Sequence, residues 1–341
     1  MRAYRKAAAG CALLLALATA GCSGPGGNGT TDAAPADPSE SSATSGASAR
    51  VTAYAPYVSA TTSSDHDSAG SPTTYNLAFV LSSGNGCTPR WNGDQDIGDA
   101  TVAARVARLK ESGATVRVSF GGASGKELAA ACDSASDLAE AYGEALDAAG
   151  STQADFDIEG DELTDAGSVA LRSEAIALLQ EERSDLEVSF TLPVMPSGLG
   201  SDSTALLASA NEYGVQVSTV NLMTMNYGES YDGDMGDYAL ASAGAAHTQL
   251  KEVFGTSDAD AWRGMAVTSM LGVNDVAGET FTLADATEVR AFADEKGIAW
   301  VSMWAAFRDQ QCTDEADTDD AATDCSGVTQ EAGAFGEAFG G

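Results

Sequence analysis

Short apolar runs alternate with amphipathic stretches along almost the whole chain after residue 50. Several of these runs are nearly continuous in Val, Leu, Met and Phe, as expected for strands that are buried on both faces. They predict eight strands, at 51–58, 74–83, 115–122, 154–160, 186–194, 217–228, 264–272 and 297–307.

Between these runs the apolar positions recur at helical spacing. Val102, Val106 and Leu109 fall on one face of such a stretch, and Gly113 is placed to end it. The pattern predicts helices over 98–112, 134–149, 164–183, 203–213, 238–254, 285–296 and 329–339. The repeated alternation of strand and helix favours an α/β fold of the (β/α)8 barrel type, and the alternative is an open, doubly wound sheet.

The first fifty residues have a different pattern. Three cationic residues precede an apolar stretch over 7–20, which is too short to span a bilayer comfortably and is typical of a signal peptide. Ala20, Gly21 and Cys22 follow, in the order found in bacterial lipoprotein signals. We therefore expect residues 1–21 to be a lipoprotein-type signal and Cys22 to be lipidated, with an ordinary secretory signal as the alternative.

Residues 22–50 are almost entirely Gly, Ser, Thr, Ala, Pro and Asp. Such a segment cannot bury enough apolar surface to offset chain entropy, so it is predicted to be a flexible tether. Residues 51–341 are predicted to form one barrel domain. We expect the protein to be extracellular, anchored to the bacterial cell membrane only by its N-terminal lipid, or secreted if no lipid is attached.

Acidic residues dominate the charge. Fifty Asp and Glu stand against seventeen Lys and Arg, which gives a net charge of −33 at pH 7. This charge argues against nucleic acid and other anionic polymers as partners and suits a neutral substrate.

Two of the six cysteines belong to the export segment, and an even number remains in a chain predicted to be exported, so two disulfides are expected. The remaining cysteines are Cys87, Cys132, Cys312 and Cys325. Three pairings are open; a Cys312–Cys325 bond would close a short loop and leave Cys87–Cys132 as its complement. A zinc site is not expected, because there is no closely spaced cysteine pair and the chain has only two histidines.

Three carboxylates alternate along the run at 154–160: Asp155, Asp157 and Glu159. Alternate residues of a strand point to one side, which in a barrel can be the interior. Grouped, buried carboxylates repel one another and lose hydration, so one of them keeps its proton towards the working pH. A general acid needs this property, and Glu159 lies at the C-terminal strand end, where barrels place active sites.

The same carboxylates could serve a different purpose. A calcium-binding EF-hand starting at Asp155 would need Glu at its twelfth position, which is Ala166. Asp-x-Asp also occurs in glycosyltransferases that use nucleotide sugars, but an exported chain would rarely meet such donors. A solvated edge strand is the remaining structural alternative.

The segment resembles the signature of glycoside hydrolase family 18 chitinases, D-x-x-D-x-D-x-E. Asp155, Asp157 and Glu159 match its last three acidic positions, and Thr152 occupies the first. Ser119-Phe120-Gly121-Gly122 resembles the S-x-G-G element of the family's third strand.

Two further elements follow in family order. Residues 223–227 resemble the sixth-strand motif, with Met225 in place of the usual Tyr and Asn226 in place of the usual Asp. Trp304 matches the eighth-strand tryptophan that floors the sugar site. The resemblance covers about residues 51–340 and is closest to a compact bacterial branch of the family.

The resemblance implies a substrate-assisted retaining mechanism with no metal or organic cofactor. Glu159 would protonate the glycosidic oxygen while the 2-acetamido oxygen of the sugar attacks the anomeric carbon. Asp157 would orient the acetamido group and bond to Glu159, and Asp155 would tune Asp157 from below.

It also implies a set of substrate-binding side chains, with Tyr227 expected to replace the hydroxyl that Met225 lacks. The set is Trp304, Asn226, Tyr227, Met223, Tyr54 and Phe79. The expected partner is chitin or another oligosaccharide containing N-acetylglucosamine, acted on by a monomer. The alternatives are an endo-β-N-acetylglucosaminidase acting on N-glycans or peptidoglycan-like chains, and a non-catalytic carbohydrate-binding barrel.

Overall fold

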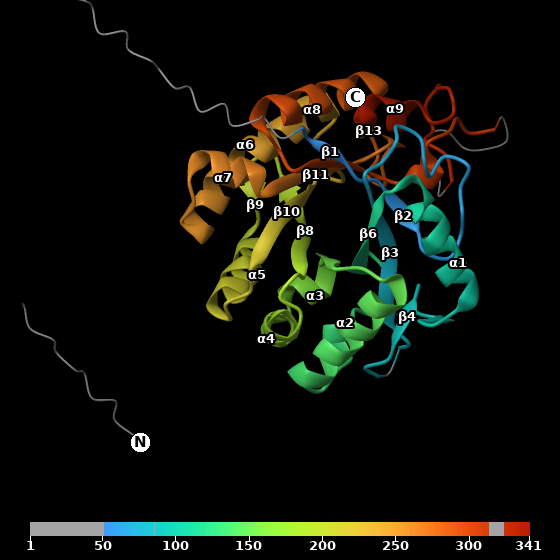
Figure 1. Ribbon diagram of the computed structural model, residues 1–341. Coiled ribbons are helices and arrows are strands. Elements are labelled where there is room, and N and C mark those ends of the chain that lie inside the picture. The colour runs from blue at the N-terminus through green and yellow to red at the C-terminus, as the bar shows by residue number, and fades with distance from the viewer. Residues whose placement is uncertain (1–50, 85, 314–323) are drawn as a thin grey trace, which may run out of the picture. The chain divides into compact units, whose positions relative to one another are not determined.

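The computed structural model of the protein describes residues 51–84, 86–313 and 324–341 (Figure 1). The predicted signal segment, the tether and Cys22 lie outside the described residues.

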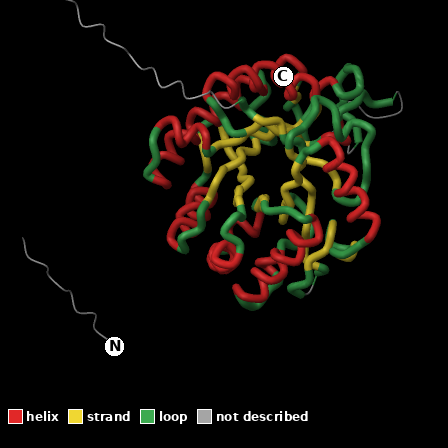
Figure 2. Tube along the Cα trace, in the orientation of Figure 1, coloured by secondary structure: helices red, strands yellow, loops and turns green. Residues whose placement is uncertain are grey.

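Parallel strands form a closed ring surrounded by helices (Figure 2). The first strand is in two pieces: β1 (Ala53–Tyr54) pairs with the last strand of the ring, and β2 (Tyr57–Ser59) pairs with the second. The ring continues through β3 (Thr74–Ser82), β6 (Thr115–Gly121), β7 (Gln153–Asp157), β8 (Glu187–Met195), β10 (Val217–Met223), β11 (Met265–Met270) and β14 (Trp300–Trp304). The eight predicted strands and the (β/α)8 barrel are confirmed.

All seven predicted helices are present (Figure 1). They are α1 (Ala100–Leu109), α2 (Ala135–Ala149), α4 (Ala166–Glu182), α5 (Ser201–Glu212), α6 (Met235–Phe254), α8 (Leu283–Lys296) and α9 (Ala334–Gly340). Side-chain caps fix several of their starts, as where Ser134 accepts a hydrogen bond from the Asp137 amide. The last helix begins five residues later than expected, because Gly333 is in the left-handed conformation, with φ of 82°.

Several shorter elements escaped prediction because two to six residues are too few to show a period. The short helices are α3 (Gly160–Thr164) and α7 (Asp258–Arg263), with single 3-10 turns at Leu128–Ala130 and Ala306–Arg308; a further 3-10 turn at Lys110–Ser112 ends the predicted helix over 98–112. The short strands are β4 (Pro89–Trp91), β5 (Gln95–Asp96), β9 (Gly198–Leu199), β12 (Gly272–Val273) and β13 (Thr280–Phe281). They lie in the connections between the ring strands and helices.

The period of two along the strands separates the outer core from the interior of the barrel. Phe156 pairs in register with Phe120 on one neighbouring strand, at 5.3 Å between ring centroids, and with Phe190 on the other, at 5.7 Å. Tyr142 of α2 packs edge-on against Phe156, so this face is the contact between sheet and helices. The adjacent positions in the same register, which include Asp155, face the interior.

The disulfides are Cys87–Cys132 and Cys312–Cys325, as the sequence favoured. The first joins the connection after β3 to the connection after β6. No helix between Val51 and the C-terminus, as far as the chain is described, is both long and apolar enough to cross a membrane.

Candidate active site

A cavity of about 360 Å³ lies at the C-terminal ends of the ring strands. Asp157 and Glu159 line it together with Trp304, Met223 and Asn226. The carboxylate strand and the sixth and eighth strands therefore bring their predicted residues to one place. The barrel fold predicts this location for an active site.

Asp155 lies below the cavity and is 1% exposed. Four hydroxyl groups donate to its two carboxylate oxygens: those of Tyr57 at 2.9 Å, Ser119 at 2.7 Å, Ser189 at 2.8 Å and Thr191 at 2.8 Å. A carboxylate that only accepts is satisfied by such a set of donors, which compensates for its lost hydration. The Ser of the S-x-G-G element is therefore one of the groups that hold this buried charge.

Asp157 is 5% exposed, and its Oδ1 atom has no hydrogen-bond partner among the described residues. Burial raises the pKa of Asp157 well above its ordinary value, and the charges of Glu159 and Asp155 raise it further. A side-chain hydrogen bond joins Asp157 to Glu159. The two carboxyl groups thus form a pair that holds a proton at a pH where ordinary carboxyl groups have lost theirs.

Glu159 is half-buried and extended at the start of α3, with φ of −144° and ψ of 173°. Burial raises the pKa of Glu159, the hydrogen bond from Asp157 lowers it, and the charges of Asp275 and Glu162 raise it again. The net direction is upward, as a general acid requires.

Two glycines allow the neighbouring strand to approach the carboxylates. Gly121 and Gly122 have φ of 96° and 95°, and the Gly122 amide donates to the Asp157 carbonyl oxygen at 2.9 Å. A β-carbon on Gly121 would lie 2.2 Å from that oxygen, and one on Gly122 would lie 2.8 Å from the Phe79 ring. The pair is therefore needed for both the backbone conformation and the close packing.

Aromatic rings form one side of the cavity. Trp304 is half-buried and stacks on Phe79 with 5.5 Å between ring centroids and 22° between planes. Tyr57 meets Trp304 edge-on at 5.8 Å. Rings that are partly exposed at a strand end suit the apolar faces of a sugar.

Relatives with known names match most of the described chain. A probable bifunctional chitinase/lysozyme of Escherichia coli (strain K12) is 34% identical over 275 residues, which are 75% of this chain and 31% of that protein. Endochitinase 11 of Metarhizium anisopliae is 33% identical over 274 residues, which are 75% of this chain and 52% of that protein. The chain thus spans about a third and about half of the length of these two relatives. No protein-family model matches the chain.

Solved structures agree with these relatives. The catalytic domain of a hyperthermophilic chitinase from Pyrococcus furiosus is 28% identical, with a TM-score of 0.75, and the match covers 85% of this chain and 94% of that one. A family 18 chitinase from Pseudoalteromonas aurantia shares the fold, with a TM-score of 0.54 at 13% identity over 74% of this chain and 94% of that one. These chitinases confirm the resemblance of the chain to glycoside hydrolase family 18.

The family 18 signature here departs from the pattern only at a remote position. Thr152 is exposed, and its carbonyl oxygen accepts the Glu187 amide where β8 begins. Parallel strands begin at the end of the barrel opposite the cavity, so the missing acidic group does not reach the reacting centre.

Two residues predicted to bind substrate in this family 18 site do not line the cavity. Tyr54 is 3% exposed; its hydroxyl donates to the Met303 sulfur, and its ring stacks on Phe339 of α9. Tyr54 and Tyr57 are three residues apart and so face opposite sides of the strand, and Tyr57 is the one that lines the cavity.

Tyr227 is the second residue that was predicted to bind substrate but does not line the cavity. Its hydroxyl accepts a hydrogen bond from Ser242 of α6, and its ring packs against Tyr231 and Tyr238. The predicted strand over 217–228 ends at Met223, and Asn226 has φ of 55°, so the alternation that would have placed Tyr227 beside Met225 does not continue. Met225 itself does line the cavity.

Asp275 also lines the cavity, and no pattern in the sequence pointed to it. It lies between β12 and β13, a hairpin that no family motif marks. Tyr57 could have been found by counting alternate residues along the first strand.

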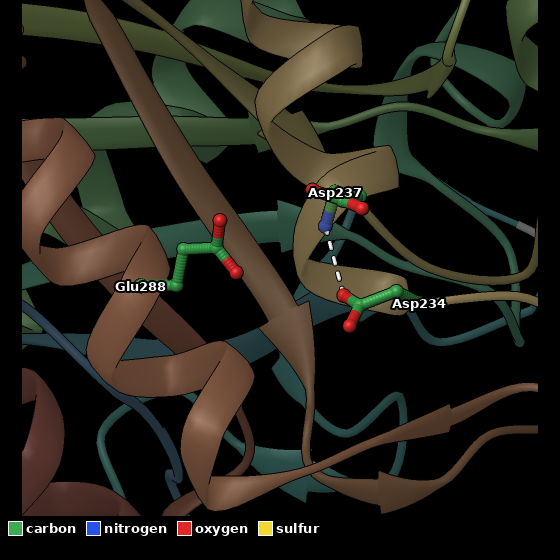
Figure 3. A group of neighbouring side chains, drawn as sticks. All are labelled: Asp234, Asp237 and Glu288. Atoms are coloured by element: carbon green, nitrogen blue, oxygen red, sulfur yellow. Dashed lines mark hydrogen bonds between the residues drawn. The ribbon is translucent and has the colours of Figure 1, made fainter.

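Figure 3 shows a second group of carboxylates, none of which lines the cavity. Asp234, Asp237 and Glu288 are exposed, and their oxygens lie within 4.8 Å of one another. The Asp234 carboxylate accepts the Asp237 amide at 3.0 Å and so caps α6. Helix capping therefore accounts for the place of Asp234 in this group.

Proposed function

We propose that the protein is a retaining chitinase that hydrolyses β-1,4-linked N-acetylglucosamine chains. The observation that carries the proposal is the hydrogen-bonded pair of Asp157 and Glu159, both with raised pKa values, at a cavity bordered by Trp304. The names of the relatives point to the same substrate.

In this mechanism the protonated Glu159 carboxyl group gives its proton to the glycosidic oxygen. The bond from that oxygen to the anomeric carbon breaks as the 2-acetamido oxygen attacks the same carbon, forming an oxazolinium ion. Glu159, now ionised, takes a proton from water as the water oxygen attacks the anomeric carbon, and the bond from that carbon to the acetamido oxygen breaks, which restores the acetamido group. Two displacements at one carbon retain its configuration.

Asp157 supplies the orienting contact. Its Oδ1 atom is buried and lacks a partner among the described groups, so it can accept the acetamido N–H without giving up another bond. Its negative charge would offset the positive charge of the oxazolinium ion. Asp155, held by four hydroxyls, would keep Asp157 poised to share its proton with Glu159.

One relative is named as both a chitinase and a lysozyme, which makes peptidoglycan-like chains the second candidate substrate. Their N-acetylated sugars carry the same internal nucleophile, so the reacting groups would be unchanged. A neutral chitin chain suits the net charge of −33 better than an anionic polymer does.

The cellular setting is part of this proposal. A signal over residues 1–21, lipidation of Cys22 and a tether over 22–50 would hold a monomeric barrel at the outer surface of a bacterial membrane. Labelling of the exported protein with a radioactive fatty acid, and its loss in Cys22→Ala, would test the anchor.

The test of the reaction compares the full mature chain with Glu159→Gln and with Glu162→Gln as the matched control. We expect wild type and Glu162→Gln to cleave a chito-oligosaccharide and release the β-anomer first, as seen by proton NMR. Glu159→Gln should bind the sugar and be slower by at least about a hundredfold. Binding without cleavage by all three proteins would favour the non-catalytic barrel, and cleavage of peptidoglycan fragments alone would favour the second substrate.

A further inference from the structure

Asn226 and Asp275 form a reciprocal pair at the cavity. The Asn226 side-chain nitrogen donates to Asp275 Oδ2 at 3.1 Å, and the Asp275 amide donates to Asn226 Oδ1 at 3.1 Å. Both side chains line the cavity that contains Glu159. Both ends of the Asn226 amide group are thus engaged by the residue opposite.

The backbone around this pair is fixed from both sides. Asn226 has φ of 55°, a conformation that Asn and Asp adopt more readily than most residues. Asn274, next to Asp275, is 2% exposed and donates to the carbonyl oxygens of Met270 and Gly272 at 3.0 Å each. The connection between β12 and β13 is therefore tied to the end of β11.

A second contact joins the same two segments. Glu279 is 1% exposed and accepts the Gly228 amide at 2.8 Å. The turn after β10 and the β12–β13 hairpin are thus held together at Asn226–Asp275 and at Gly228–Glu279. Asp275 is presented to the cavity by a braced hairpin.

The charges around the pair come from several elements. Glu159 faces Asp157 of β7, Glu162 of α3 and Asp275. Asp275 also interacts with the Arg308 guanidinium, which follows β14. Asp275 is the carboxylate that enters the cavity from the hairpin side.

We propose that Asp275 is a substrate-binding residue that contacts the hydroxyl groups of the bound sugar, and that Asn226 is the positioning residue that holds it there. Asp275 Oδ2 already accepts from Asn226, and its remaining lone pairs are available to the hydroxyls of a sugar in the cavity. This inference rests on the proposed glycosidase function. On this side of the cavity the negative charge comes from Asp275 of the β12–β13 hairpin. Asn226 acts by holding Asp275 in place.

The experiment uses Asp275→Asn, Asn226→Asp and the double variant that exchanges the two side chains, all in the full mature chain. Asp275→Asn should raise KM about tenfold, because a hydrogen bond to a charged group is lost. Its loss of charge should also move the alkaline limb of the pH–rate profile to lower pH, since less repulsion lets Glu159 ionise sooner. Asn226→Asp should lower kcat/KM, because two carboxylates would then face each other.

The exchange variant is the decisive arm. It restores one amide and one carboxylate, and the backbone amide of residue 275 still has an acceptor at position 226. We expect it to recover much of the kcat/KM lost in Asn226→Asp. Glu162→Gln is the matched control: it should move the same pH limb without changing KM, because Glu162 does not line the cavity.

The outcomes separate the two proposals. Absence of cleavage by the wild type overturns the chitinase proposal and this inference with it. Cleavage by the wild type, with KM unchanged in Asp275→Asn, overturns the inference alone. Circular dichroism melting curves show whether each variant is folded, and equal losses in both single variants with no recovery in the exchange would also contradict the pairing.

Discussion

Gly121 lies directly against Asp157: a β-carbon at position 121 would be 2.2 Å from the Asp157 carbonyl oxygen. The contact joins β6 to the end of the carboxylate strand, just before Glu159. The packing of β6 and the placement of Glu159 therefore depend on the same few atoms, which makes this glycine a sensitive position.

Gly121→Ala should destabilise the protein by more than about 2 kcal/mol and reduce activity, because both the positive φ and the backbone clash oppose a side chain. Gly113→Ala is the control, since its φ of 88° is similar and its β-carbon would meet nothing within 4 Å. It should cost about 1 kcal/mol. Urea unfolding measures both, and equal losses would show that the clash is relieved by small shifts.

The raised pKa values of Asp157 and Glu159 also affect stability. Carboxyl groups whose pKa is raised by folding stabilise the folded state below their ordinary pKa, and this contribution is lost as pH rises through the folded pKa. Glu159→Gln should therefore melt at a higher temperature than wild type at alkaline pH, and the difference should shrink towards acid pH. Melting temperatures measured across the pH range test this, and a difference independent of pH would contradict it.

Two tyrosines of the first strand form a matched pair for mutation. Tyr57→Phe removes a hydroxyl that donates to Asp155 at 2.9 Å, so we expect a loss of about 1.5–3 kcal/mol in stability and a fall in kcat. Tyr54→Phe removes only a contact to the Met303 sulfur and should cost about 0.5 kcal/mol with normal kinetics. A larger effect of Tyr54→Phe than of Tyr57→Phe would contradict this and indicate that Tyr54 belongs to the site.

A buried ion pair supports the connection that borders the cavity after Gly122. Arg172 donates to Glu127 at 2.7 Å, and both side chains are no more than 3% exposed. Arg172→Met leaves the Glu127 carboxylate buried without its cation and should cost about 3–5 kcal/mol.

Arg183→Met is the control for that change. Arg183 binds Asp147 through two hydrogen bonds of 2.7 and 2.8 Å, but the two side chains are 30% and 69% exposed, so about 0–1 kcal/mol should be lost. Chemical denaturation measures both variants. A small effect at Arg172 would show that the buried ion pair contributes little to stability.

Much of the fold could be predicted because its elements repeat. Buried strands give apolar runs and covering helices give a period near 3.6, so the eight strands and seven of the helices could be located. The predicted strand over 217–228 was too long because Asn226 turns the chain, which no periodicity reports. Hairpins such as β12–β13 are too short to show a pattern.

Site residues could be predicted where their positions follow from the alternation of side chains along a strand. Asp155, Asp157 and Glu159 alternate, and their positions at or below the cavity follow from that alternation and from the barrel. Tyr227 was misplaced because its strand ends early. Asp275 was missed because its position depends on tertiary hydrogen bonds to Asn226, which leave no trace in the sequence.

The divided first strand has a consequence for the order of assembly. Ala53 pairs with Trp300, and Tyr54 stacks on Phe339, so one edge of the first strand has no partner until nearly the whole chain has been made. A chain leaving the ribosome cannot close its ring before its last strand, β14, emerges. Such a chain remains open during synthesis, and an open chain is what the export proposed above would require. Pairing between the first and last strands thus makes completion of the barrel a late event. A chain exported as it is made would close its barrel only after it has crossed the membrane.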